Sequence, residues 1–143
     1  MFKSIEPEVA GGLGKDTKLD TTTHPPVVFY LHYEFYGWLD NDILESFPCF
    51  IVTDRLREAI LDARLSGVAF DHVKVTTTDE FEAFHPGVVL PPWSWMKISG
   101  KAGMDDFGIS DKLRLVVSEK AFGVLSLFNI SAADVEDFMQ NTQ

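Results

Sequence analysis

Cysteine and long apolar runs are nearly absent from this chain. Cys49 is the one cysteine among 143 residues, so an intrachain disulfide is excluded. It stands in the apolar stretch FPCFIV, where a buried and unreactive thiol is expected. No run approaches the ~20 apolar residues that a membrane-spanning helix needs. The opening MFKSIEPEVAGG contains no apolar signal-peptide core. We therefore expect a soluble, cytoplasmic protein with no membrane partner.

Basic residues are also scarce. The chain has 12 Lys and Arg against 22 Asp and Glu, which gives a net charge of −10 and a pI of about 4.6. Direct binding to nucleic acid is not expected, because phosphate recognition needs clustered Lys and Arg. The same balance favours a cationic protein partner and would accelerate association with it. The alternative is that the charge serves solubility alone.

Familiar catalytic patterns are missing as well. The segment GGLGKDT, residues 11–17, resembles a phosphate-binding loop, but Val9 and Asp16 stand where that motif needs Gly and Ser or Thr. The four histidines lack zinc-protease spacing, and no serine stands in a G-x-S-x-G motif. We expect no enzyme, no cofactor and no bound metal. The alternative is an enzyme that uses carboxylates such as Glu34 and Asp40.

Internal repetition is the most informative feature that is present. Residues 51–70, IVTDRLREAILDARLSGVAF, align without a gap to residues 116–135, VVSEKAFGVLSLFNISAADV, at an offset of 65 residues. In each copy a β-branched run leads to Thr53 or Ser118, whose hydroxyl can cap a helix. Apolar residues then recur with helical spacing. Each copy predicts a strand, a cap and a helix, and Gly67 is expected to end the first helix. The alternative is convergence on a common strand-to-helix pattern.

The remaining segments predict a mixed fold. Residues 1–26 are rich in Gly, Thr and Pro, so we expect an irregular arm. The strands predicted after it are a well-buried one over 27–33, one over 68–75 and a half-exposed one over 93–99. The predicted helices are a short one over 43–47, capped by Asp40, Asn41 and Asp42, and one over 78–84 with Thr77 and Glu80 as capping box. Residues 130–139 form either a short helix capped by Ser131 or an edge strand. No linker divides the chain. We expect a single domain over 1–143, of α/β or α+β class, with a mixed sheet and a few short helices.

Aromatic rings gather beside acidic residues in one part of the chain. Aromatic anchors next to carboxylates are what a basic protein partner would need. The predicted partner-binding residues are Tyr36, Trp38, Asp40, Asp42 and Glu45, with Asp105 and Asp106 as outer candidates. The alternative is a small-molecule or carbohydrate site built from the rings of Tyr36, Trp38, Trp93 and Trp95. Tyr30, Phe35 and Trp93 are expected in the core.

The repeat also carries a family resemblance. The segments IVTDRLREAILDARLSGVAFDHVKV and RLVVSEKAFGVLSLFNI resemble the strand–[Ser/Thr]–acid–base–helix–Leu-x-Gly segment of bacterial immunity-protein-like families from polymorphic toxin systems. HPPVVFYLHYEFYGWLDNDILESFPCFIVT resembles the fuller signature of a bacterial family of this size. The resemblance covers much of residues 6–135 as patterning. It implies a non-enzymatic protein that binds and neutralises a cognate toxin, often a nuclease or another cytosol-acting enzyme. The paired CxxC motifs of a zinc-binding branch are missing, and no interface residues carry over.

Overall fold

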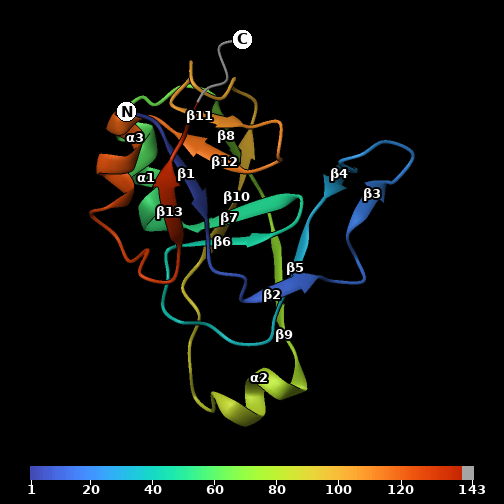
Figure 1. Ribbon diagram of the computed structural model, residues 1–143. Coiled ribbons are helices and arrows are strands. Elements are labelled where there is room, and N and C mark those ends of the chain that lie inside the picture. Colours follow the sequence, from blue (N-terminus) through green and yellow to red (C-terminus); the bar gives the residue numbers. More distant parts are fainter. Residues whose placement is uncertain (140–143) are drawn as a thin grey trace.

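The computed structural model describes residues 1–139 (Figure 1). The chain folds as one α+β domain in which strands predominate, and three short helices lie within the described part. The strands are β1 (Lys3–Glu6), β2 (Gly11–Leu13), β3 (Lys18–Asp20), β4 (Val27–Tyr30), β5 (His32–Phe35), β6 (Ile43–Ser46), β7 (Cys49–Thr53), β8 (Val68–Asp71), β9 (Lys74–Thr77), β10 (Trp93–Ile98), β11 (Phe107–Ile109), β12 (Leu115–Val117) and β13 (Asp134–Asp137). The helices are α1 (Asp54–Asp62), α2 (Asp79–Phe84) and α3 (Glu119–Leu125). Over residues 1–139, no helix combines the length and the apolar character needed to cross a membrane.

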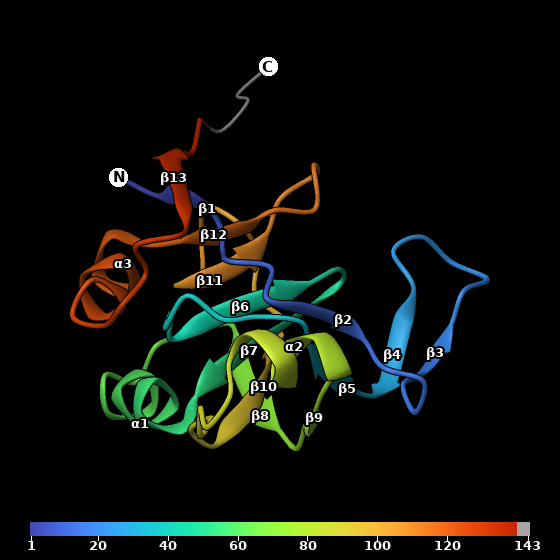
Figure 2. The same cartoon turned by 90° about the horizontal axis from the view of Figure 1, so that it is seen from below.

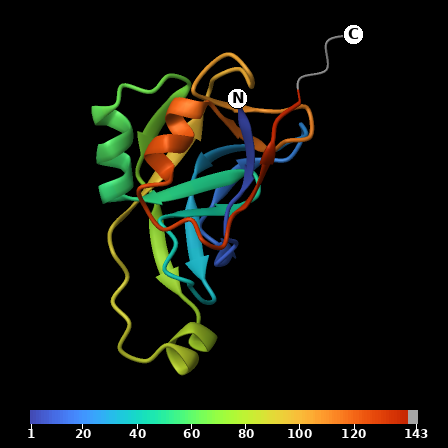
Figure 3. The ribbon, with the colours of Figure 1, turned by 60° about the vertical axis from the view of Figure 1, so that its left-hand side comes forward.

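The two four-stranded sheets are built alike, except that β1, from the start of the chain, takes the place in the second sheet that β10 takes in the first. The first runs β6-β7-β10-β8 and the second β11-β12-β1-β13, and neighbouring strands in both are antiparallel. The second strand of each order leads directly into a helix, β7 into α1 and β12 into α3. Figures 1 and 3 show these two helices side by side. The predicted repeat is therefore a repeat of structure, in which β6, β7, α1 and β8 correspond to β11, β12, α3 and β13.

The two repeat units begin their helices in the same way. The Thr53 side chain accepts the N–H of Leu56, and the Ser118 side chain accepts the N–H of Ala121. Each cap satisfies a backbone N–H that has no partner within the helix. The helix residues that face the core are Leu56 and Ile60 in α1, and Ala121 and Leu125 in α3. The two predicted strand–cap–helix units are thereby confirmed.

Two hydrophobic cores hold the elements together. The first lies between the two four-stranded sheets and helices α1 and α3, and it includes Ile5, Met96 and Phe107. The second is rich in aromatic rings and lies around the three-stranded sheet β2-β5-β9 and helix α2. In it the Phe35 ring packs 5.5 Å from the Trp93 ring, so both are core residues as predicted. Tyr30, which was also expected in the core, is only half-buried. Burying a large apolar side chain contributes roughly 1.5–3 kcal/mol, so this second core gives α2 and β5 a firm support.

Residues 1–26 are not an irregular arm. They supply β1 to the interior of one four-stranded sheet, β2 to the three-stranded sheet, and β3 to the β3-β4 hairpin that projects from the body (Figure 2). Ser4 pairs with Val116, so the backbone of β1 finds its hydrogen-bond partners near the other end of the chain. The glycine content of this segment suggested an irregular arm, but Gly11 is needed within a sheet. A Cβ there would lie 2.0 Å from the carbonyl oxygen of Glu34. The glycine permits close strand pairing rather than flexibility.

Residues 43–47 form strand β6 and its turn instead of the predicted helix. Ile43 is buried in the first core and Leu44 in the second. Successive side chains on a strand point to opposite faces, so these two neighbouring residues of β6 can enter different cores. β10 is likewise buried on both faces over its first four residues, rather than half-exposed.

The strand expected over 68–75 is divided into β8 and β9, which belong to different sheets. The remaining predicted elements agree in type and differ at their ends. The strand expected over 27–33 is divided into β4, which is partly exposed, and β5, which is mostly buried. The helix over 78–84 is confirmed as α2, but its N-cap is Thr78 rather than Thr77. Helix α1 ends at Asp62, and Gly67 follows later with a φ of 82° against the carbonyl of Phe107. Of the two alternatives after Ser131, the structure has the edge strand, β13.

Candidate functional site

The loop after β5 exposes an aromatic, an aliphatic and an acidic side chain. Tyr36 is 50% exposed, and Leu39 and Asp40 are also exposed. Asp40 has a φ of 65°, a left-handed conformation that Asp tolerates better than most residues. Two of the predicted partner-binding residues, Tyr36 and Asp40, therefore lie on the surface of one loop.

The same loop is fixed from beneath. The Trp38 indole N–H donates to the carbonyl of Asn41 at 2.9 Å, and its ring packs edge-on 5.8 Å from Trp93. The N–H of Leu39 donates to the buried carboxylate of Glu8 at 2.8 Å. Trp38 is therefore half-buried and acts as a support for the loop, while its neighbours face solvent.

Helix α2 lies next to this loop (Figures 1 and 2). The N–H of Thr78 donates to the carbonyl of Phe35 at 3.0 Å, and the rings of Phe35 and Phe81 pack edge-on 6.3 Å apart. A Cβ on Gly37 would lie 3.5 Å from Nε2 of His85, just after the helix. Contacts at both ends of α2 thus place it beside the loop.

We name residues 34–40 and 78–90 the acidic end. Its acidic residues are Glu34, Asp40, Asp79, Glu80 and Glu82, and it contains no Lys or Arg. Two large apolar side chains are strongly exposed there, Phe84 at 74% and Val89 at 88%. Sequence reasoning missed the contribution of α2. The signal was present, because Lys and Arg are missing from the whole of 19–54 and 75–96.

Asp42 does not belong to the exposed surface. It is only 1% exposed, and its two carboxylate oxygens accept the guanidinium of Arg55 at 2.8 Å each. It also accepts the Thr53 hydroxyl at 2.7 Å and the N–H of Asn129 at 2.9 Å. Burial opposes its ionisation, but these donors outweigh burial and hold the pKa of Asp42 below its ordinary value. Asp42 ties the start of α1 to the loop that follows α3.

Asp106 plays the same part in the other repeat unit. It accepts the Ser118 hydroxyl at 2.6 Å and the N–H of Ser66, in the loop that follows α1, at 2.9 Å. Its neighbour Asp105 accepts the N–H of Lys101 at 2.7 Å and closes a turn. Each repeat unit thus holds the loop of the other through one aspartate. The predicted outer candidates are therefore engaged in internal contacts and are not joined to the acidic end.

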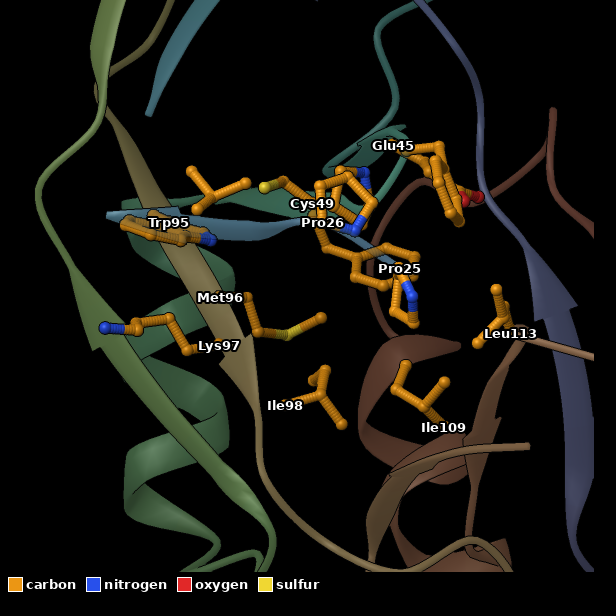
Figure 4. A pocket seen from close by; sticks show the side chains of 14 residues that line it. Pro25, Pro26, Glu45, Cys49, Trp95, Met96, Lys97, Ile98, Ile109 and Leu113 are labelled. Atoms are coloured by element: carbon orange, nitrogen blue, oxygen red, sulfur yellow. The ribbon is translucent and has the colours of Figure 1, made fainter. Parts of the chain in front are cut away.

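Glu45 lies elsewhere, on the wall of a pocket of about 260 Å³ (Figure 4). The pocket is bounded by residues 25–28, the β6–β7 turn, β10 and the β11–β12 loop. Burial raises the pKa of Glu45 to about 7, with a smaller contribution from the nearby charge of Glu6. The predicted acidic residues therefore do not form one site: Asp40 lies on a surface loop, Asp42 and Asp106 make internal hydrogen bonds, and Glu45 lines a pocket.

The alternative aromatic site is not assembled as predicted. Trp93 and Trp95 are both buried, and Trp93 is covered by Trp38. Lys97 lies over the Trp95 ring, with its ammonium 4.7 Å from the ring centre. Of the four rings, only that of Tyr36 is largely exposed. A stacking platform for a sugar would need several exposed ring faces in one place.

The other chemical candidates have structural roles. Cys49 is buried, and burial raises the pKa of its thiol to about 12, so the reactive thiolate is disfavoured. In the glycine segment 11–17, the N–H of Gly14 donates to the carbonyl of His32, and a Cβ on Gly14 would lie 2.2 Å from that imidazole. These glycines serve close packing. Among residues 1–139, no cluster of three or more His, Cys, Asp or Glu could hold a metal ion.

Comparison with protein-family models and with curated proteins finds no match for this chain.

Proposed function

We propose that the chain is an immunity-like protein that binds a cognate, cytosol-acting toxin and neutralises it by occluding its active site or substrate groove. The observation that carries the proposal is the acidic end. It combines five carboxylates and no Lys or Arg with the exposed rings of Tyr36 and Phe84. The resemblance of residues 51–70 and 116–135 to immunity-like segments supports the same function.

The chemistry of the acidic end suits a basic protein. Uncompensated carboxylates attract a positively charged groove and accelerate association with it. Exposed aromatic and aliphatic side chains such as Tyr36, Phe84 and Val89 supply the apolar anchors from which protein interfaces gain most affinity. A nuclease is a suitable target class, because its substrate groove must be basic to hold phosphates. The proposed neutralisation is therefore a competition between protein carboxylates and nucleic-acid phosphates for one groove.

The shape of the acidic end suits occlusion. Figures 1 and 3 show α2 at one end of the molecule, away from α1 and α3. Phe81, on the inner side of the helix, is buried against Phe35, so the projecting helix has a firm base. A preformed projection loses little conformational freedom on binding and can fill a groove as a rigid body.

The test is capture followed by an activity measurement. The tagged protein is used to capture partners from its source lysate, the bound proteins are eluted with stepwise salt, and they are identified by mass spectrometry. The purified partner is then assayed for its own activity with increasing amounts of this protein. We expect one basic partner in a stoichiometric complex, released by salt, whose activity disappears at an equimolar ratio. A partner that retains full activity in the complex would contradict neutralisation.

A further inference from the structure

The pocket beside Glu45 is built from segments that are distant in the sequence. Figure 4 shows side chains of β10 on one side of the view, Ile109 below them, and Glu45 with Leu113 on the other side. Its wall is largely hydrocarbon, including Phe47, Met96 and Ile109. The volume of about 260 Å³ is slightly below the roughly 300–1,000 Å³ of pockets for drug-sized ligands. The pocket therefore suits a smaller organic molecule.

One charge in this pocket is free to meet a ligand. The Glu45 carboxylate has no hydrogen bond or ion pair with any residue of the described chain, 1–139. Lys97 also lines the pocket, but its ammonium lies over the Trp95 ring and 3.6 Å from the carboxylate of Asp71. The Cys49 thiol is neutral, because burial raises its pKa. A ligand in the pocket would therefore meet hydrocarbon and one carboxylate.

We propose that this pocket binds a small organic cation, in which an ammonium group is attached to an aromatic ring or a branched hydrocarbon. The ammonium forms an ion pair with Glu45, and the hydrocarbon packs on Met96, Ile98 and Ile109. Both parts are required: the apolar wall supplies most of the favourable transfer free energy, and the carboxylate selects for positive charge. The site is separate from the acidic end and does not depend on the proposed function.

The charges around Glu45 predict how binding responds to pH. Glu6 disfavours the ionised form of Glu45, and Arg114 favours it but is itself paired with Glu6. Across the pocket, Lys97 is paired with Asp71. Because burial places the Glu45 pKa at about 7, the carboxylate is only partly ionised at neutral pH. A bound ammonium group favours ionisation, so the affinity for an amine should increase between pH 6 and pH 8.

Isothermal titration calorimetry with three amines of different shape tests the proposal. The amines are 2-phenylethylamine, cyclohexylamine and 3-methylbutylamine, and the comparison ligands are neutral 2-phenylethanol and anionic phenylacetate. At pH 8 we expect at least one amine to bind saturably and at least tenfold more tightly than the alcohol. Glu45→Gln should abolish that preference, and Ile109→Trp, which fills the pocket, should abolish binding. Asp62→Asn, which removes an exposed carboxylate at the end of α1, outside both the pocket and the acidic end, should bind like the wild type.

Three results would overturn the assignment. The first is that none of the amines binds to the wild-type protein at millimolar concentration. The second is that Glu45→Gln, folded as judged by circular dichroism, binds the amine as tightly as the wild type does. The third is that phenylacetate binds at least as tightly as the amine, which would make Lys97 the group that selects the ligand.

Discussion

At the residue scale, neighbouring carboxylates have different roles because of contacts that the sequence does not display. Asp40 and Asp42 are two positions apart, yet Asp40 is exposed and Asp42 is buried in a network of donors. One of these donors is the backbone of Asn129, which belongs to the other repeat unit. The density of acidic residues is readable from the sequence, but the burial of any one of them depends on tertiary partners. For this reason the predicted site contained both surface and structural acids.

Asp42→Ala should destabilise the protein strongly. The substitution removes the acceptor for the Arg55 guanidinium, the Thr53 hydroxyl and the N–H of Asn129. We expect the free energy of unfolding in urea at pH 7 to decrease by about 2–3 kcal/mol, since hydrogen bonds to a charged group are among the stronger ones. The control is Asp40→Asn, which removes an exposed charge, tolerates the left-handed backbone at this position and should change stability by no more than about 0.5 kcal/mol. Equal effects of the two variants would contradict the role given to Asp42.

Glu45→Gln should alter the pH dependence of stability. Burial raises the Glu45 pKa from its ordinary 4.5 to about 7, so the folded state holds this proton more tightly than the unfolded state does. The resulting stabilisation is complete below pH 4.5 and is lost as the pH rises through 7. The glutamine variant should therefore unfold like the wild type at pH 4.5. At pH 8 it should be more stable by on the order of 1 kcal/mol, a value reduced for solvent screening. Urea unfolding at both pH values is the measurement, and an identical difference at both would refute the pKa shift.

At the element scale, short-range sequence patterns predicted the repeat units well and the segments between them poorly. The caps at Thr53 and Ser118 and the helix faces that follow them depend on neighbours within four positions, so they can be read from the sequence. Strand β6 was predicted as a helix, because the acidic residues before it resemble a helix cap. Its real conformation is determined by the two cores that Ile43 and Leu44 enter, and these cores are assembled from the whole chain.

The caps provide a direct test of the structural repeat. Thr53→Ala and Ser118→Ala each remove a hydroxyl that accepts a helix N–H and donates to an aspartate of the same unit, Asp42 or Asp106. Each substitution should lower the free energy of unfolding by about 1–2 kcal/mol. The decrease in the free energy of unfolding should be larger for the Thr53 variant, because Thr53 is more deeply buried than Ser118. The measurement is thermal or urea unfolding, and a loss below about 0.3 kcal/mol in either variant would argue against equivalent caps.

At the scale of the whole molecule, strands that are distant in the sequence pair with each other, and this pairing creates features that composition could not predict. β1 lies between β12 and β13, so an N-terminal segment expected to be irregular completes the second four-stranded sheet. The acidic end arises in the same way. Residues 34–40 and 78–90 meet because β5 and β9 pair in parallel and Phe35 packs on Phe81. A single domain that mixes helices and strands was predictable from alternating patterns, but the choice between α/β and α+β, like the site, needed the strand order.

The most direct test of the central claim is the affinity of the captured basic partner for two matched charge-reversal variants, measured by calorimetry at two salt concentrations. One variant carries Asp40→Lys and Glu80→Lys in the acidic end. The other carries Asp62→Lys and Asp111→Lys, exposed positions at the end of α1 and in the β11–β12 loop, so the two have equal net charge. We expect the first variant to lose at least a hundredfold in affinity and much of the salt dependence, and the second to stay within about threefold of the wild type. Equal losses in both variants, or no loss in the first, would contradict the acidic end as the binding surface.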